Sequence, residues 1–180
     1  MLGYVRAGRI QRPSLPPPRP LRRRRRHLFV VTVGRQRQYG YPSADSVDNS
    51  WTDQAGGTSL FAAIDETLTP SDADYIQSPI TPVNSGCRVK VISLVDPASS
   101  IQHQIHWRAG KRHLTGPQVN MTVTLRQGGG DSLGGGTEIA SFTRNNVGDF
   151  ATYIEELNTT QADSITDYTD LYLEFYANQV

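Results

Sequence analysis

Acidic side chains are missing from the first 37 residues of the chain, which hold eleven arginines and neither aspartate nor glutamate. The formal charge of this segment is therefore +11. Residues 38–180, with seven Lys or Arg and seventeen Asp or Glu, carry a formal charge of −10. Such asymmetry is typical of a basic tail joined to an acidic folded body.

Cysteine and long apolar runs are scarce as well. Cys87 is the only cysteine, which excludes an intramolecular disulfide framework. No apolar stretch approaches the roughly 18 residues of a membrane-spanning helix. We therefore expect no membrane partner.

A short apolar run, LFVVTV at 28–33, follows five consecutive arginines. It is shorter than the apolar core of about 7–15 residues that a secretion signal has, and Gly-Arg-Gln-Arg follows instead of a small-residue cleavage site. The run favours a β-strand over 28–33 and argues against secretion.

Residues 1–26 are predicted to form an extended arm, and residues 27–180 a folded domain. Five prolines between 13 and 20 remove backbone donors and favour extended conformations, and the arginine block repels itself. At about 3.1 Å per residue such an arm reaches roughly 80 Å. Alone in solution it is expected to be disordered.

The body alternates apolar and polar residues with a period of two, which predicts strands with one buried face. The clearest alternation covers 119–127, 101–108 and 171–177, and 87–95 begins in the same way before Ile92 and Leu94 break the pattern, which indicates a bulge or a strand covered on both faces. Further strands are predicted over 28–33, 58–64, 137–143 and 149–155, and a short helix, capped by Thr159 or Thr160, over 159–168. Seven to nine short strands predict an all-β fold, an antiparallel β-sandwich of jelly-roll-like type.

Side chains with catalytic or metal-binding chemistry form no recognisable pattern. His103 and His106 are three residues apart on a predicted strand and so point to opposite faces, which argues against a shared metal. The acidic clusters lack the twelve-residue EF-hand pattern and are interpreted as turn and capping aspartates. GxSxG, HExxH and a phosphate loop are absent, and GGGDSLGGG at 128–136 is interpreted as a flexible hairpin loop. We expect no enzymatic activity, no cofactor and no metal.

Two tyrosines are the candidate surface-contact residues of the body. Tyr172 and Tyr176 fall on the polar side of their strand with Glu174 between them, and both are predicted to be exposed. Such a pair suits stacking against a sugar ring or contact with another subunit.

Four segments of the body carry a family resemblance. They are SADSVDNSWTDQAGGTSLFAAIDETLTPSDADYIQSP, CRVKVISLVDP, MTVTLRQG and ITDYTDLYLEFYA, within residues 43–180. In this order they resemble small virion-associated β-sandwich proteins of tailed bacteriophages. The resemblance implies a structural component of a particle, located in the virion and assembled in the bacterial host cytoplasm. It carries over no active-site residue.

Three hypotheses follow. The first is a non-enzymatic virion protein that decorates the capsid as a cement protein, or sits at the neck or tail. It is expected to form a homo-oligomer on the particle, with its arm contacting other virion proteins such as major capsid or neck and tail subunits. The second is a carbohydrate-binding module for host adhesion, and the third is nucleic-acid binding through the arm. The acidic body would repel a duplex, so protein contact is ranked above nucleic acid. The arm residues expected to make the contacts are Arg19, Arg22, Arg23, Arg24, Arg25 and Arg26.

Overall fold

The computed structural model describes residues 2–6, 38–65, 72–92, 94–112 and 115–180. Within them the chain forms ten strands, one 3-10 helix and one short α-helix. The elements in chain order are β1 (Leu2–Arg6), β2 (Tyr41–Val47), β3 (Thr52–Asp53), η1 (Phe61–Ala63), β4 (Ile76–Gln77), β5 (Ser85–Ile92), β6 (Gln104–Gly110), β7 (Val119–Gln127), β8 (Thr137–Arg144), β9 (Ala151–Glu156), α1 (Thr159–Asp163) and β10 (Leu171–Gln179). The strand predicted over 28–33 lies outside the described residues.

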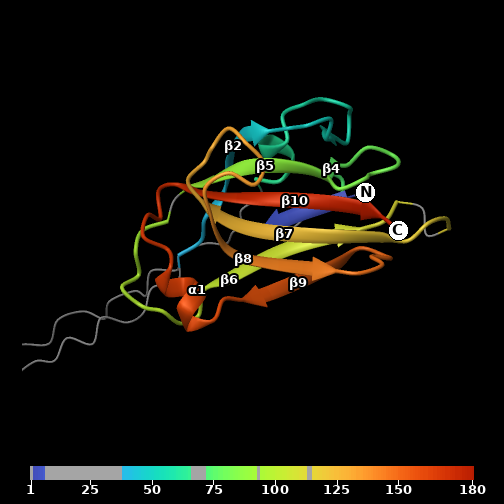
Figure 1. Cartoon of the computed structure of the whole chain (residues 1–180). Coiled ribbons are helices and arrows are strands. Elements are labelled where there is room, and N and C mark those ends of the chain that lie inside the picture. The colour runs from blue at the N-terminus through green and yellow to red at the C-terminus, as the bar shows by residue number, and fades with distance from the viewer. Residues whose placement is uncertain (1, 7–37, 66–71, 93, 113–114) are drawn as a thin grey trace, which may run out of the picture.

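The strands form two five-stranded sheets in which every pairing is antiparallel. The first sheet has the order β3-β4-β1-β6-β9, and the second has the order β2-β5-β10-β7-β8. Figure 1 shows the sheet with β10 and β7 lying in front of the sheet that contains β1 and β6. The all-β, antiparallel character predicted from the sequence is therefore confirmed.

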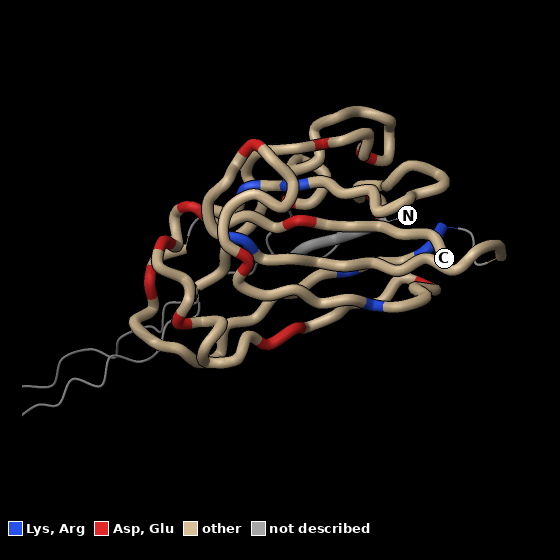
Figure 2. The backbone as a smooth tube through the Cα atoms, viewed as in Figure 1, with Lys and Arg blue, Asp and Glu red and all other residues tan. Residues whose placement is uncertain are grey.

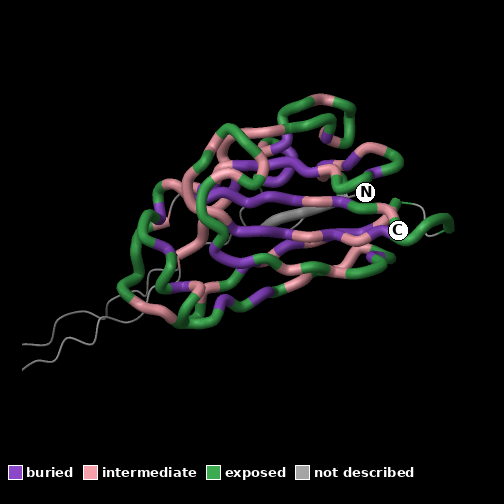
Figure 3. The backbone as a smooth tube through the Cα atoms, viewed as in Figure 1, coloured by how far each residue is buried: buried purple, intermediate pink, exposed green. Residues whose placement is uncertain are grey.

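One core joins the two sheets. The first sheet contributes Ile76 and Trp107 to it, and the second contributes Cys87, Val123 and Phe175, all fully buried. Figure 3 shows the buried residues running along β5, β10 and β7. The two sheets therefore pack against each other in a sandwich-like arrangement.

Period-two alternation located the central strands well. β7, β8 and β10 begin at the predicted residues, and β9 lies within one or two residues of its prediction. β6 begins at Gln104 and not at 101, because Gln102 has a φ of 66° and cannot continue an extended strand. For 87–95 the sequence predicted a bulge or a strand covered on both faces. β5 ends at Ile92, and its pairing with β2 contains two register shifts, between Pro42 and Ala44 and between Asp45 and Val47.

Two local predictions were wrong. Residues 58–64 contain the 3-10 helix Phe61–Ala63 and no strand, because the Asp45 carboxylate accepts the backbone N–H groups of Leu60 and Phe61 at 3.0 and 2.7 Å. The predicted helix 159–168 is helical only to Asp163, and its N-cap is Asn158. Asn158 and Gln161 form a reciprocal capping box.

The segment Leu2–Arg6 differs most from expectation. It was assigned to the arm, yet as β1 it pairs with β4 on one side and β6 on the other, inside the first sheet. Three of its five residues, Leu2, Tyr4 and Val5, are apolar or favour strands. The prolines and arginines that follow them dominate the composition of 1–26 and hid this strand signal. The remaining arm, 7–26, lies outside the described residues. Within the part of the chain that the structure describes, no helix is long and apolar enough to cross a membrane.

Neighbouring substitutions on β7 test the register. Val123 is fully buried, whereas Thr122 is half-buried and its hydroxyl lies 2.8 Å from that of Thr143. We expect Val123→Asp to lower the free energy of unfolding by more than about 4 kcal/mol or to prevent soluble folding, because it buries an unpaired carboxylate. Thr122→Asp should cost about 1 kcal/mol or less. Equal effects in denaturant unfolding would contradict the register.

Candidate functional site: a covered ion-pair network on the second sheet

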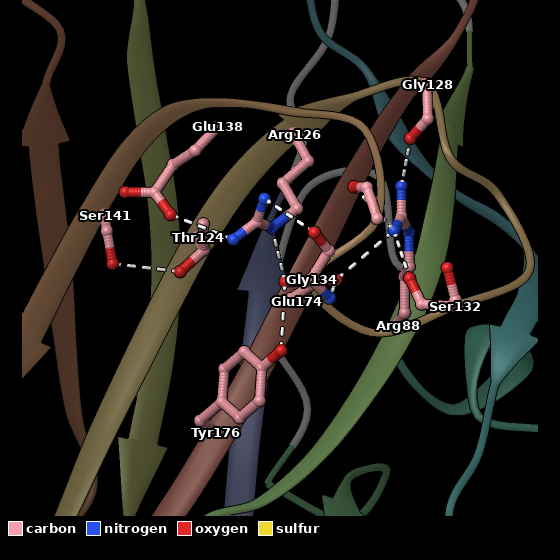
Figure 4. A network of polar contacts seen from close by, with 11 residues as sticks. Arg88, Thr124, Arg126, Gly128, Ser132, Gly134, Glu138, Ser141, Glu174 and Tyr176 are labelled. Carbon is pink, nitrogen blue, oxygen red and sulfur yellow. Dashed lines mark hydrogen bonds and ion pairs between the residues drawn. The ribbon is translucent and has the colours of Figure 1, made fainter.

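The outer face of the second sheet holds the two tyrosines predicted to be exposed. Tyr172 retains only 7% of its exposure and Tyr176 is half-buried, so that prediction was wrong. Between them Glu174 is fully buried. The loop 128–136, which joins β7 to β8, lies over this face, and its backbone contacts the charged side chains beneath it (Figure 4).

The loop depends on glycine for its shape. Gly129 and Gly136 have φ values of 68° and 73°, in the left-handed region that side chains rarely adopt. The two backbone segments also cross closely, because a Cβ on Gly129 would lie 2.1 Å from the Gly136 nitrogen. Residues 128–136 form a hairpin loop as predicted, and its backbone is hydrogen-bonded to side chains of the sheet.

Arg88 on β5 anchors the loop from below. Its guanidinium is fully buried and donates to the carbonyl oxygens of Ser132 at 2.6 Å, Gly135 at 3.1 Å and Gly128. It also lies 4.2 Å from the centre of the Tyr172 ring, a cation–π contact. Burial lowers the pKa of Arg88 from its usual value, and the neighbouring Glu174 opposes that shift.

Glu174 on β10 is the centre of the network. One carboxylate oxygen accepts from the backbone N–H of Gly134 at 2.7 Å and from Arg88 at 3.3 Å. The other accepts from Nε of Arg126 at 2.7 Å and from the Tyr176 hydroxyl at 3.2 Å. Burial, and then the Glu174 charge, raise the pKa of Tyr176 to about 12. The carboxylate thus faces two guanidinium groups with both oxygens occupied.

Arg126 on β7 extends the network to the surface. Besides Glu174 it binds Glu138 at 2.9 Å and the carbonyl oxygen of Gly134 at 3.2 Å. Glu138 is half-exposed, with 52% of its side-chain surface accessible. The network therefore runs from a dry ion pair under the loop to a solvated one at the edge strand β8.

A second buried carboxylate joins the two sheets. Glu155 on β9 accepts from the Trp107 indole at 3.2 Å and from Arg144 on β8 at 3.0 and 2.6 Å. Because β8 and β9 are edge strands of different sheets, this carboxylate ties the edges together. Both Glu155 and Glu174 were missed in the sequence. Glu155 lies within the strand predicted over 149–155, but the sequence analysis assigned no buried face to that strand.

His103 and His106 do not share a site. His103 Nε2 lies 2.7 Å from the Tyr168 hydroxyl, and His106 contacts Gln104, so the two rings have different partners. Burial lowers the pKa of His103. No group of three or more His, Cys, Asp or Glu side chains is placed to hold a metal ion among the residues that the structure describes.

The charges of the described body are spread over several elements (Figure 2). The arm residues Arg19 and Arg22–Arg26 lie outside the described residues, so their contacts stay a prediction. Each oxygen of Glu174 has two partners in this network, whereas the buried Nε of Arg88 has no hydrogen-bond partner among the described residues. The arrangement of the network suits a structural clamp and leaves no carboxylate oxygen of Glu174 for acid–base chemistry.

Comparison of the chain with models of protein families, with curated proteins and with solved structures finds no match.

Two carboxylates that bind the same arginine provide a matched test. We expect Glu174→Gln to lower the free energy of unfolding by about 3 kcal/mol, because it leaves buried Arg88 without its counter-charge. Glu138→Gln removes a half-exposed partner of Arg126 and should cost less than about 1 kcal/mol. The measurement is urea unfolding at neutral pH. Similar losses for both variants would show that burial of the pair does not govern its contribution.

Alanine substitutions at two glycines distinguish the cost of a left-handed backbone conformation from the cost of steric overlap. Gly129 and Gly134 both have positive φ, at 68° and 73°, but only Gly129 lies against other backbone atoms. Gly134→Ala should cost about 1 kcal/mol from the left-handed conformation alone. Gly129→Ala should cost a further 1–3 kcal/mol or so, because the loop must move off the sheet. Equal unfolding midpoints for the two variants would contradict the close crossing.

Proposed function

We propose that this chain is a non-enzymatic structural protein of a tailed-bacteriophage virion, a jelly-roll-like β-sandwich that decorates the capsid as a cement protein. Its basic arm would attach it to neighbouring virion subunits, and the protein would act as repeated copies on the particle. The proposal starts from the four segments that resemble virion-associated proteins, within residues 43–180.

The observation that carries the proposal is that side chains of those segments form hydrogen bonds within the fold. The Trp51 indole donates to Ser85 at 3.1 Å, and Gln127 accepts the backbone N–H groups of Thr166 and Asp167 at 2.8 and 2.9 Å. Asp167 in turn accepts from Thr169 at 2.8 Å. These contacts hold loops and strand ends in place, as expected where a family shares a scaffold and not a catalytic centre.

Two ion pairs, one fully buried and one with its arginine half-exposed, support the same role. Arg88 and Glu174 fasten a loop to the second sheet, and Glu155 with Arg144 fastens the two sheets at one edge. Breaking such a pair is costly, since it leaves a buried charge without its partner. Resistance to local opening suits a protein whose task is to hold its shape on a particle.

Exposed apolar side chains support contact with other subunits. Three of the large ones in the described surface, Ile80, Val83 and Val180, are 97%, 83% and 68% exposed. The segments that carry them adjoin, because Gln179 donates to the carbonyl oxygen of Pro82 at 2.7 Å. Adjoining exposed apolar residues are typical of surfaces that a partner covers. The carbohydrate-binding alternative has less support, since Tyr172 is buried and Tyr176 is half-buried.

The test is loading of the purified protein onto particles that lack it. Replacing Arg22–Arg26 with glutamine should reduce loading several-fold, because attachment depends on the arm's positive charge. Loading should also weaken at high salt, where the screening length falls from about 8 Å to about 3 Å at 1 M. The matched control replaces the same five residues with lysine, which keeps the charge but not the bidentate geometry.

Empty and DNA-filled particles separate the two arm partners. Equal loading on both supports docking on protein. Loading on filled particles alone would overturn that in favour of nucleic-acid binding, whose affinity falls steeply with salt. Loading that ignores the glutamine substitutions would contradict an arm-dependent attachment altogether.

A further inference from the structure

The strand β1 holds the first sheet together. Leu2 and Gly3 pair with Gln77 and Ile76 of β4, and all five residues pair with β6, from Leu2 opposite Gly110 to Arg6 opposite His106. In the sheet order β3-β4-β1-β6-β9, β4 and β6 are not neighbours. Without β1 the sheet would divide into β3-β4 and β6-β9, and β6 would present an unpaired inner edge.

The connection between β1 and the rest of the fold is unusually long. Thirty-one residues, 7–37, separate Arg6 from Gln38, which is the next described residue. Connections within compact domains have a median of about 4–6 residues. A proline- and arginine-rich segment of this length reaches about 100 Å when extended, whereas a domain of this size is on the order of 40 Å across. The strand can therefore reach the same position in a neighbouring copy.

The strand's backbone pairs are the same whether it comes from its own chain or from another. The choice is set by effective concentration, which for a flexible connection is in the millimolar range and falls when the linker is too stiff to fold back. This connection contains five consecutive arginines and five prolines, a composition typical of extended and stiff linkers. Copies held side by side on an assembly raise the concentration of the neighbour's strand.

We propose that residues 2–6 of one copy occupy the position between β4 and β6 of a neighbouring copy, so that the chains are linked by strand exchange. The partner is a second copy of this chain, recognised through main-chain hydrogen bonds in the manner of strand addition. The inference rests on the proposed function only in that the protein acts as repeated copies. In this arrangement the N-terminal end of the arm is held in the first sheet of the neighbouring copy.

The test uses cysteines at paired positions of the full-length chain. Residues directly opposite in an antiparallel pair lie within disulfide range, and Arg6 is opposite His106. The native Cys87 is fully buried, and burial raises the pKa of its thiol, so it can stay in every variant. Arg6→Cys and His106→Cys proteins are unfolded together, refolded as a mixture and oxidised. Non-reducing electrophoresis should show a covalent dimer that contains both chains.

The matched control replaces the His106→Cys protein with Glu156→Cys. Glu156 is exposed on β9 and pairs with Gln104, so it is not opposite residue 6. The mixture of Arg6→Cys with Glu156→Cys should give at most a tenth of the dimer. Equal dimer yields from both mixtures would indicate collision between exposed thiols and would overturn the proposal.

The double variant Arg6→Cys/His106→Cys decides between pairing within one chain and pairing between chains. Exchange predicts covalent dimers and longer ladders, increasing as protein concentration rises from micromolar to about millimolar. A cross-linked monomer alone over that whole range would overturn exchange and assign β1 to its own chain. Absence of any disulfide would overturn it as well, since residue 6 would then not lie beside residue 106.

This outcome is independent of particle loading. If the double variant cross-links only within one chain while loading still requires Arg22–Arg26, strand exchange is wrong and the proposed function stands. If covalent dimers form but loading ignores the arginines, the arm links copies without attaching them to a particle.

Discussion

The carboxylate of Glu174 is the group on which the second sheet depends. It lies on the middle strand of that sheet, fully buried, and two arginines, a tyrosine and a backbone N–H converge on it. A charge in such a place is tolerated only when it is paired and hydrogen-bonded. The loop 128–136 supplies part of that compensation and covers the carboxylate, so opening of the loop would remove one of its partners.

The first sheet is held in a different way. Its inner strand β1 is separated from the other strands by a long arginine- and proline-rich sequence. Its outermost strands β3 and β9 differ greatly in length. Glu155 compensates at one edge by binding Trp107 and, across the gap between the sheets, Arg144. One sheet is thus secured through its outer face and the other through its edge. The apolar core between them buries the inner faces of both sheets.

Much of the fold could be predicted from the alternation of residues, and the candidate site could not. Val119, Met121 and Val123 alternate cleanly, and their strand lies where the pattern placed it. The pairing of Arg88 with Glu174 requires knowing that β5 and β10 are neighbours in one register, which neither strand encodes alone. Leu60 and Ile64 read as part of a strand because the Asp45 carboxylate that folds them into a 3-10 turn lies fifteen residues away from Leu60. The burial of Tyr172 could not be predicted, because the glycine-rich sequence 128–136 does not indicate that this loop folds over the sheet.

The contacts that fasten the loop have a consequence for engineering. Arg88 binds the loop through the main-chain carbonyl oxygens of Gly128, Ser132 and Gly135, and Glu174 binds the N–H of Gly134. The side chain of Asp131 is exposed at the tip and contributes to none of these bonds. A fluorophore or short epitope attached at residue 131 would leave the hydrogen bonds of Arg88 and Glu174 to the loop backbone in place. The tip of this loop is therefore an exposed attachment point whose flanking backbone is hydrogen-bonded to the sheet.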